Sequence, residues 1–344
     1  MQSSVMFSTE RSPFFSVILP FYNAAEWLPD SITSITSQSC NDWELICVDD
    51  GSSDSGLKIV KEYAAEDNRI KLFVQENAGV SAARNAGIAV ARGRYIMFLD
   101  ADDFFDADAL SLIRNALEQT DADMLTMRLR EVHKEVHFNS TESHRQVQIS
   151  PDKQLRLLTP YTTDKVYKSS HIRELSLRFN ELITISEDFH FWMSFAIQSN
   201  KLFHLDNVLY NHRLTPGSLS GRYIGRWQTC PLDELKTNLG FFNELADLCD
   251  GIHSIERRRL FRKELLRRGV DFHVRYGLKT IHLKGKRRLE AIKIARIPIC
   301  KLMRELGTSD AINAFILAIK IVLQILKASF TFRIKRFIKN TKIK

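Results

Sequence analysis

Short apolar segments alternate with helical patterns through the first third of the chain, and this alternation constrains the fold more than any other feature. β-rich apolar segments predict strands at residues 16–20, 44–48, 70–74, 95–99 and 123–127. Between them, apolar spacing predicts helices at residues 24–38, 54–67, 81–91 and 106–119, with Asp54 and Asp106 as N-caps. Strands joined by helices form a mostly parallel sheet with helices on both faces. The predicted fold class is therefore α/β.

Polar loops follow these strands, at the sheet edge where open α/β sheets bind ligands. The first strand runs into Tyr22-Asn23 and the second into Asp49-Asp50. Two adjacent carboxylates at a strand end repel each other and need hydrogen-bond donors or a cation nearby. A nucleotide base or ribose supplies such donors, whereas a turn followed by an N-cap explains only Gly51 and Asp54.

The third helical pattern carries an arginine near its start, Arg84. The small residues around it fit close packing of a helix on the sheet. A guanidinium fixed at such a position is suited to bind a diphosphate or a carboxylate.

The fourth strand ends in the acidic segment Asp100-Ala101-Asp102-Asp103. In an extended chain, with a rise of about 3.3 Å per residue, alternate residues face the same side, so Asp100 and Asp102 are expected to address one ligand. Carboxylate oxygens suit Mg²⁺ or Mn²⁺, and these cations leave coordination sites open for substrate phosphates. The pattern alone does not distinguish a metal site from an acidic turn.

Two further acids, Glu187 and Asp188, begin a predicted aromatic helix at residues 187–199. Acids in a first helical turn interact favourably with the helix dipole, by about 0.3 to 1 kcal/mol each. A general base is the other interpretation, and the sequence leaves both open.

Taken in order, four segments resemble the successive motifs of family 2 glycosyltransferases, which have the GT-A fold. These segments are residues 17–23, 48–54, 79–87 and 100–103. The resemblance is close over about residues 14–110 and looser at residues 163–167, 187–188 and 210–213.

The resemblance implies a nucleotide-sugar site. Its residues are Pro20, Tyr22, Asn23, Asp49, Asp50, Arg84, Asp100 and Arg213. Within it, Asp50 would contact the uracil base and Arg213 would close over the diphosphate. The resemblance also implies Mn²⁺ or Mg²⁺ at Asp102, supported by Asp100, and a general base at Asp188 beside Glu187.

The implied activity is an inverting transfer of a sugar from a nucleotide-diphosphate donor, a UDP-sugar, to a hydroxyl of a saccharide or lipid-linked saccharide. Polysaccharide or lipopolysaccharide biosynthesis would use such a reaction.

A sugar nucleotidyltransferase is one alternative, but its Gly-rich phosphate-binding signature is absent after the first strand. A noncatalytic GT-A-like scaffold is the other, and the retained acids argue against it. The expected GT-A domain spans residues 14–220, with a donor half at 14–127 and an acceptor half at 128–220.

A basic helical region is expected to follow at residues 221–344. Residues 255–344 contain 25 Lys and Arg against 6 Asp and Glu, whereas residues 1–254 contain 24 against 35. Polar residues fall along one stripe of residues 311–332, which predicts an amphipathic helix and not a membrane span. Basic charge beside an apolar face favours docking on an anionic membrane surface over nucleic acid, so no nucleic-acid partner is expected.

The five cysteines include no C-x-x-C pair, which argues against a disulfide framework and a zinc site. No secretory signal is evident in residues 1–12. We therefore expect a cytoplasmic protein, peripheral on the inner face of the membrane.

Overall fold

The computed structural model describes residues 12–132, 146–148, 159–184, 186–214, 232–265 and 268. The chain divides into two compact units. The first consists of Met1–Ile149, Leu158–Glu181 and Glu187–Pro216, and the second of Ser150–Leu157, Leu182–Ser186 and Gly217–Lys344. The predicted domain boundary at residue 220 and the predicted amphipathic helix at 311–332 lie outside the described residues.

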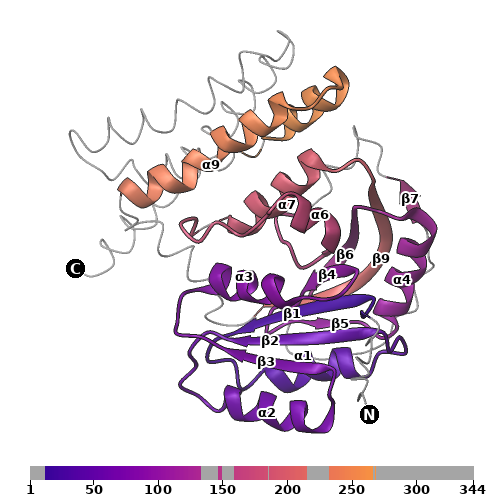
Figure 1. The fold of residues 1–344 in the computed structure, drawn as a ribbon, viewed down its shortest axis with the longest axis vertical. Coiled ribbons are helices and arrows are strands. Elements are labelled where there is room, and N and C mark those ends of the chain that lie inside the picture. Colours follow the sequence, from indigo (N-terminus) through magenta and orange to yellow (C-terminus); the bar gives the residue numbers. More distant parts are fainter. Residues whose placement is uncertain are drawn as a thin grey trace, which may run out of the picture. The chain divides into compact units, whose positions relative to one another are not determined.

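One sheet runs through the first unit in the order β3-β2-β1-β4-β8-β6-β9-β5, with β7 paired to β9 (Figure 1). Its strands are β1 (Phe15–Phe21), β2 (Trp43–Asp49), β3 (Ile70–Val74), β4 (Tyr95–Phe98), β5 (Phe104–Phe105), β6 (Met124–Val132), β7 (Gln146–Gln148), β8 (Lys165–Lys168) and β9 (Leu202–Arg213). The neighbours β3, β2, β1 and β4 are parallel, which confirms the predicted parallel half. The predicted fifth strand, β6, does not extend this half directly, because β8 lies between β4 and β6 and is antiparallel to both.

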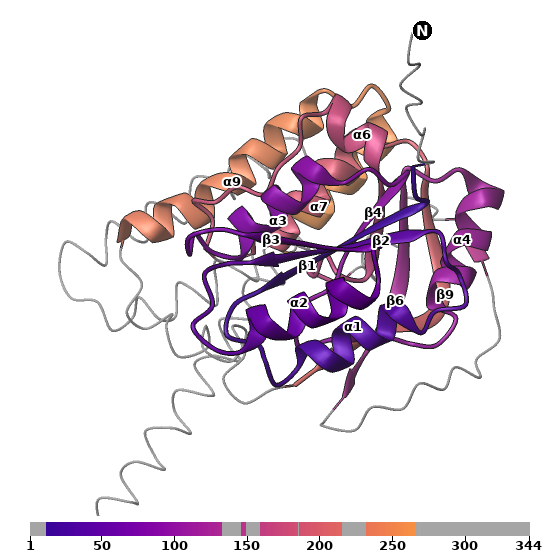
Figure 2. The ribbon, with the colours of Figure 1, turned by 60° about the horizontal axis from the view of Figure 1, so that its bottom comes forward.

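Helices cover both faces of the parallel strands. Figure 2 shows α3 (Val80–Val90) on one face and α1 (Leu28–Thr36) and α2 (Gly56–Glu66) on the other. Alternate residues of β1, including Val17 and Leu19, join the core that α1, α2 and α4 (Ala109–Thr120) build with the sheet. On the opposite face, Ile18 meets Gly87 of α3, where an added Cβ would lie 2.4 Å from the isoleucine Cγ2. Only glycine allows this close approach of helix to sheet.

The two predicted N-caps differ from the structure. α2 begins at Gly56, and Asp54 accepts the N–H of that residue at 2.9 Å, although the cap position is the next residue along. The N-cap of α4 is Asp108 and not Asp106, so the prediction for Asp106 was wrong. Its carboxylate is buried and accepts hydrogen bonds from Arg130 at 2.6 Å and Asn211 at 2.8 Å. These long-range partners replace the local cap.

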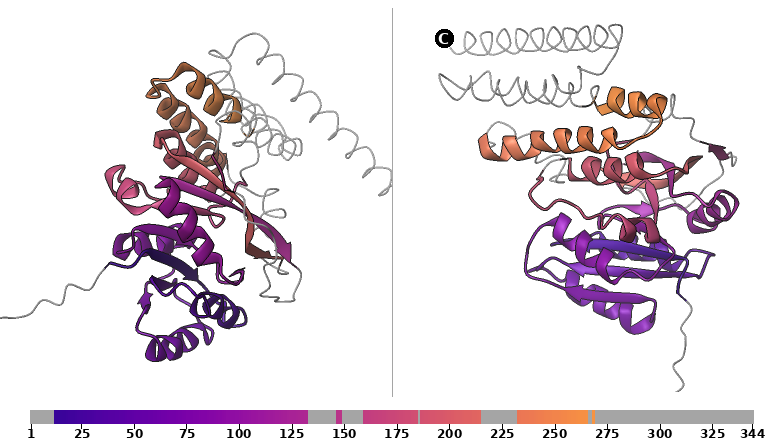
Figure 3. Two further views of the ribbon diagram at one scale, coloured as in Figure 1. Left: turned by 90° about the vertical axis from the view of Figure 1, so that its right-hand side faces the viewer. Right: turned by 45° about the horizontal axis from the view of Figure 1, so that its top comes forward.

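The remaining helices of the first unit are α6 (Ser169–Glu174) and α7 (Glu187–Gln198). The described part of the second unit includes α9 (Leu232–Asp250) and a helix at residues 255–265, which folds back beside the end of α9 (Figure 3). An ion pair between Arg262 and Asp250 joins these two helices. Among the described helices, none combines the length and the apolar character needed to cross a membrane.

Candidate active site

The loops that follow β1 and β2 are held together by their own polar side chains. Asn23 adopts φ 49°, in the left-handed region that asparagine tolerates, and its Oδ1 accepts the N–H of Ser53 at 2.8 Å. Asp49 is buried, and its Oδ1 accepts the N–H of Ser52 at 2.9 Å. Pro20 is buried within β1, whereas Tyr22 just beyond it is exposed. The structure therefore gathers these predicted residues at one edge of the sheet.

Asp50 is buried, and the donors that its carboxylate requires come from the protein itself. Its Oδ1 accepts from the side-chain amide of Gln75 and the N–H of Ala78, both at 2.8 Å. Its Oδ2 accepts the N–H of Gly79 at 2.9 Å. Asp50 thus fixes the loop that precedes α3, and its contact with a uracil base stays a prediction.

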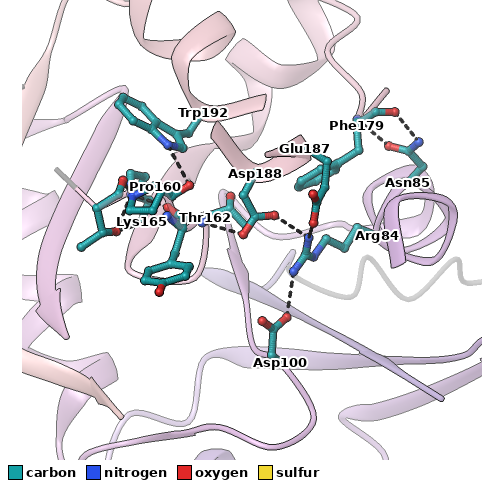
Figure 4. Close-up of polar contacts among 12 residues, drawn as sticks. Arg84, Asn85, Asp100, Pro160, Thr162, Lys165, Phe179, Glu187, Asp188 and Trp192 are labelled. Carbon is teal, nitrogen blue, oxygen red and sulfur yellow. Dashed lines mark hydrogen bonds and ion pairs between the residues drawn. The ribbon is translucent and has the colours of Figure 1, made fainter. Parts of the chain in front are cut away.

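Arg84 connects α3 to two other parts of the first unit through carboxylates (Figure 4). Its side chain is 3% exposed, and its Nη1 lies 2.6 Å from Oδ1 of Asp188 at the start of α7. Its Nη2 lies 2.8 Å from Oδ1 of Asp100, which follows β4. A third carboxylate, that of Glu187, lies 3.7 Å from Nη1. Arg84 therefore pairs with carboxylates of the protein itself, and its contact with a nucleotide stays a prediction.

The two acids at the start of α7 have different partners. Asp188 accepts the N–H of Thr162 through Oδ2 at 3.2 Å and has the shorter contact with Arg84. Burial raises the pKa of both acids, and the charge of Asp188 further raises the pKa of Glu187, to about 8. Arg84 opposes this rise in the pKa of both acids. Its guanidinium lies nearer to Asp188, at 2.6 Å, than to Glu187, at 3.7 Å, which favours Asp188 as the charged member of the pair and therefore as the base.

The raised pKa of Glu187 predicts a pH-dependent gain in stability on replacement by glutamine. An acid whose pKa is higher in the folded state costs stability as pH rises from the ordinary carboxyl range through its folded pKa, here about 8. Glu187→Gln removes that titration. Its melting temperature relative to the wild type is expected to be higher at pH 8 than at pH 5, by about 2 °C or more. Equal differences at both pH values would contradict the assignment.

The segment after β4 is a turn, so the expected extended geometry of residues 100–102 was wrong. The N–H of Asp103 donates to the carbonyl of Asp100 at 3.0 Å, and the chain then reverses into β5. Asp103 is buried and accepts from the Tyr210 hydroxyl at 2.7 Å and the N–H of Arg213 at 2.8 Å. The same hydroxyl accepts the N–H of Asp100 at 3.2 Å. β9 thus holds the acidic turn in place.

Arg213 lies at this turn, but its guanidinium has another partner. The side chain is buried, and Nη2 lies 2.8 Å from Oδ2 of Asp30 in α1. The guanidinium carbon also lies 4.7 Å from the ring centroid of Trp27. Its contact with a diphosphate stays a prediction.

The acidic turn fits a divalent cation held by few protein ligands. Asp100 is 34% exposed at its side chain and Asp102 is partly buried, whereas Asp103 is buried and tied to β9. Within the described ranges, no group of three or more His, Cys, Asp or Glu side chains could hold a metal ion. Hard cations such as Mg²⁺ keep waters and substrate phosphates as further ligands. The residues present therefore match a cation bound jointly by this turn and a substrate.

Residues 16–179 match the family model described as glycosyl transferase family 2. This segment of the chain belongs to that family. The curated relative EpsJ of Bacillus subtilis, described as an uncharacterized glycosyltransferase, is 32% identical over 226 residues. That alignment covers 60% of this chain and 63% of EpsJ, so the chain spans less than two thirds of this relative.

Solved structures show that the family 2 fold here is of the GT-A type. S. aureus TarS 1-349 in complex with UDP-GlcNAc has a TM-score of 0.71 at 18% identity, covering 92% of this chain and 91% of that one. The mannosyltransferase PcManGT from Pyrobaculum calidifontis, in complex with GDP-Man and Mn²⁺, has a TM-score of 0.53 at 17% identity, covering 94% and 84%. At these identities the likeness concerns the fold.

Several residues of this family 2 site were not singled out from the sequence. Gln75 supports Asp50, Thr162 supports Asp188, and Tyr210 supports the acidic turn. The last two lie in or beside segments 163–167 and 210–213, which carried only the looser resemblance. That resemblance was the available signal.

Proposed function

We propose that this family 2 glycosyltransferase transfers a sugar from a UDP-sugar to a hydroxyl of a saccharide or lipid-linked saccharide, with inversion at the anomeric carbon. One observation carries the proposal. Arg84 joins Asp188, a carboxylate held ready on α7, to Asp100 at the carboxyl edge of the parallel strands. The proposed proton acceptor, Asp188, and an acid on the side of the sugar donor, Asp100, therefore share the guanidinium of one arginine.

In the proposed reaction, Asp188 takes the proton of the acceptor hydroxyl as the hydroxyl oxygen attacks the anomeric carbon. The new glycosidic bond forms as the bond from that carbon to the diphosphate oxygen breaks, and the nucleoside diphosphate leaves. Arg84 and the Thr162 N–H hold the Asp188 carboxylate in one orientation. A positioned base of this kind contributes about 10² to 10⁴ in rate.

We further propose that Asp102, with Asp100, holds Mn²⁺ or Mg²⁺. When bound, such a cation neutralises charge on the departing diphosphate. The partial exposure of Asp100 and Asp102 supports this assignment, as does the Mn²⁺ of the similar fold in PcManGT. The UDP-GlcNAc complex of TarS supports a uridine donor. The place of Pro20, Tyr22, Asn23, Asp49 and Asp50 at the same edge fits a nucleotide-binding role.

A panel of nucleotide sugars with Mn²⁺, following release of the nucleoside diphosphate, tests the function. At least one UDP-sugar is expected to be turned over, and Asp102→Asn should lower that turnover by about 10²-fold or more, because a cation ligand is lost. Release of pyrophosphate would instead indicate a nucleotidyltransferase, and no turnover of any donor would favour a scaffold. Unchanged turnover in the Asp102 variant would contradict the metal assignment.

We also propose that the basic region after residue 254 docks the enzyme on an anionic membrane surface from the cytoplasmic side. Its charge of 25 Lys and Arg against 6 Asp and Glu supports this. The full chain is expected to float with vesicles rich in phosphatidylglycerol, to dissociate at 1 M salt because charges are screened within about 3 Å there, and not to float with phosphatidylcholine. Equal binding to both vesicle types would contradict electrostatic docking.

A further inference from the structure

A lysine ammonium lies buried close to the proposed base. The Lys165 side chain is 0% exposed, and its Nζ lies 2.6 Å from Oδ1 of Asp164. The same Nζ donates to the carbonyls of Tyr161 and Thr159, and it lies 4.9 Å from the ring centroid of Trp192. An ammonium is costly to bury without acceptors, so these oxygens must stay around it. Lys165 thereby dictates the path of residues 159–164, the base-side loop.

The base-side loop has two further attachments. Oδ2 of Asp164 accepts the hydroxyl of Thr159 at 2.8 Å, which closes the loop on itself. From α7, the indole N–H of Trp192 donates to the carbonyl of Pro160 at 3.2 Å. Trp192 stands four residues after Asp188 and so lies on the same side of that helix. The loop is therefore fixed against the helix that carries the base.

Together these attachments direct one backbone N–H group toward the carboxylate of the base. The N–H of Thr162, within the base-side loop, donates to Oδ2 of Asp188, while Arg84 takes Oδ1 (Figure 4). The Thr162 hydroxyl lies 2.7 Å from that of Tyr167, so the residue is anchored on its other side as well. Both oxygens of the base are thus held from opposite directions.

We propose that Lys165 is a positioning residue for Asp188, acting through the base-side loop and the Thr162 N–H. The inference rests on the proposed function, because it requires that Asp188 be the base. A residue needed only for packing at this site would carry no charge, since an apolar side chain fills a buried space at lower cost. The charge of Lys165 and the Thr162 hydrogen bond both lower the pKa of Asp188, against the effect of burial. Loss of Lys165 should therefore disturb both the orientation and the protonation of the base.

The test compares turnover, donor KM and pH dependence in the full-length enzyme. Lys165→Met is combined with Asp164→Asn, so that no buried carboxylate is left unpaired. We expect kcat to fall about 10- to 100-fold, because small misplacements of a catalytic group cost up to about 10² in rate. The donor KM should change less than about 3-fold, and the acidic limb of the kcat profile should move to higher pH.

Two controls accompany the double variant. Asp164→Asn alone keeps the ammonium, its carbonyl acceptors and an amide oxygen, so its effect on turnover should be smaller than that of the double variant. Lys168→Met makes the same substitution three residues along β8, where the lysine pairs with Asp121 instead, and should leave the pH profile unchanged. If the double variant does not fold, Lys165→Gln, which keeps an N–H donor but loses the charge, should show the same pH shift.

An unchanged acidic limb with normal kcat, in whichever variant folds, would overturn the proposal. So would an effect confined to donor KM or to melting temperature. Asp188→Asn separates this failure from that of the proposed function. Wild-type turnover in Asp188→Asn removes the base assignment itself, whereas an inactive Asp188→Asn beside a normal Lys165 variant removes only the role of Lys165.

Discussion

Asp188→Asn is expected to lower kcat by about 10² to 10⁴ while the donor Kd stays within about 3-fold of the wild type. Asparagine has nearly the same shape and can still accept the Arg84 hydrogen bond through its oxygen, but its amide cannot take a proton at neutral pH. Steady-state release of the nucleoside diphosphate measures the first quantity, and calorimetric titration with the donor measures the second.

The neighbouring acid provides a matched control for this experiment. Glu187 has a raised pKa, about 8, so at neutral pH glutamine closely resembles its protonated side chain. Glu187→Gln should therefore reduce kcat less than about 10-fold. A loss in Glu187→Gln as large as that in Asp188→Asn, or larger, would reverse the roles of the two acids.

Arg84→Gln is expected to be the most destabilising change at the site. It leaves Asp188 and Asp100 without their shared cation, and breaking a buried ion pair on one side costs about 3 to 5 kcal/mol. That corresponds to a fall in melting temperature of roughly 10 °C. Because Arg84 holds down the pKa of Asp188, turnover should also be lost at pH 7 and partly regained at higher pH. Thermal melting and a kcat profile from pH 6 to 9 measure both effects.

Two other arginine variants isolate the cause of this effect. Arg84→Lys keeps the charge, but its single ammonium replaces a planar fork that contacts two carboxylates in different directions, so part of the stability should return. Arg128→Gln breaks a pair with Asp206 in which both side chains are about half exposed, 52% and 48%, and should cost at most about 1 kcal/mol. Wild-type melting of Arg84→Gln would show that the carboxylates of Asp188 and Asp100 need no common cation.

The parallel half of the fold could be predicted because its signal is local. Each strand from β1 to β4 is an apolar segment followed by residues with helical spacing, and the structure has its strands and helices at these segments. β8 was not predicted because Lys165–Lys168 has only four residues and pairs on both sides with strands distant in sequence. Its place in the sheet depends on long-range pairing that no short pattern encodes.

The candidate site also combines residues with a local signal and contacts that depend on long-range pairing. Strand-end acids and the acid pair at the start of α7 could be recognised from their positions alone. The contact of Arg84 with Asp188 could not, because it joins residues 104 apart in sequence. Asp106 shows the opposite error, in which a plausible local role gave way to distant partners. The local sequence therefore identifies candidate site residues, whereas tertiary contacts determine which of these residues lie within hydrogen-bond distance of one another.

The close approach of Gly87 to Ile18 has a consequence for the reaction. Arg84 precedes this glycine by three residues and so lies on the same side of α3. The depth at which α3 rests on β1 therefore sets how far the guanidinium reaches between Asp100 and Asp188. The sheet therefore limits the position of the guanidinium that contacts both Asp100 and Asp188. A methyl group added at position 87 is expected to displace α3 as a whole, and with it the Arg84 contact to Asp188.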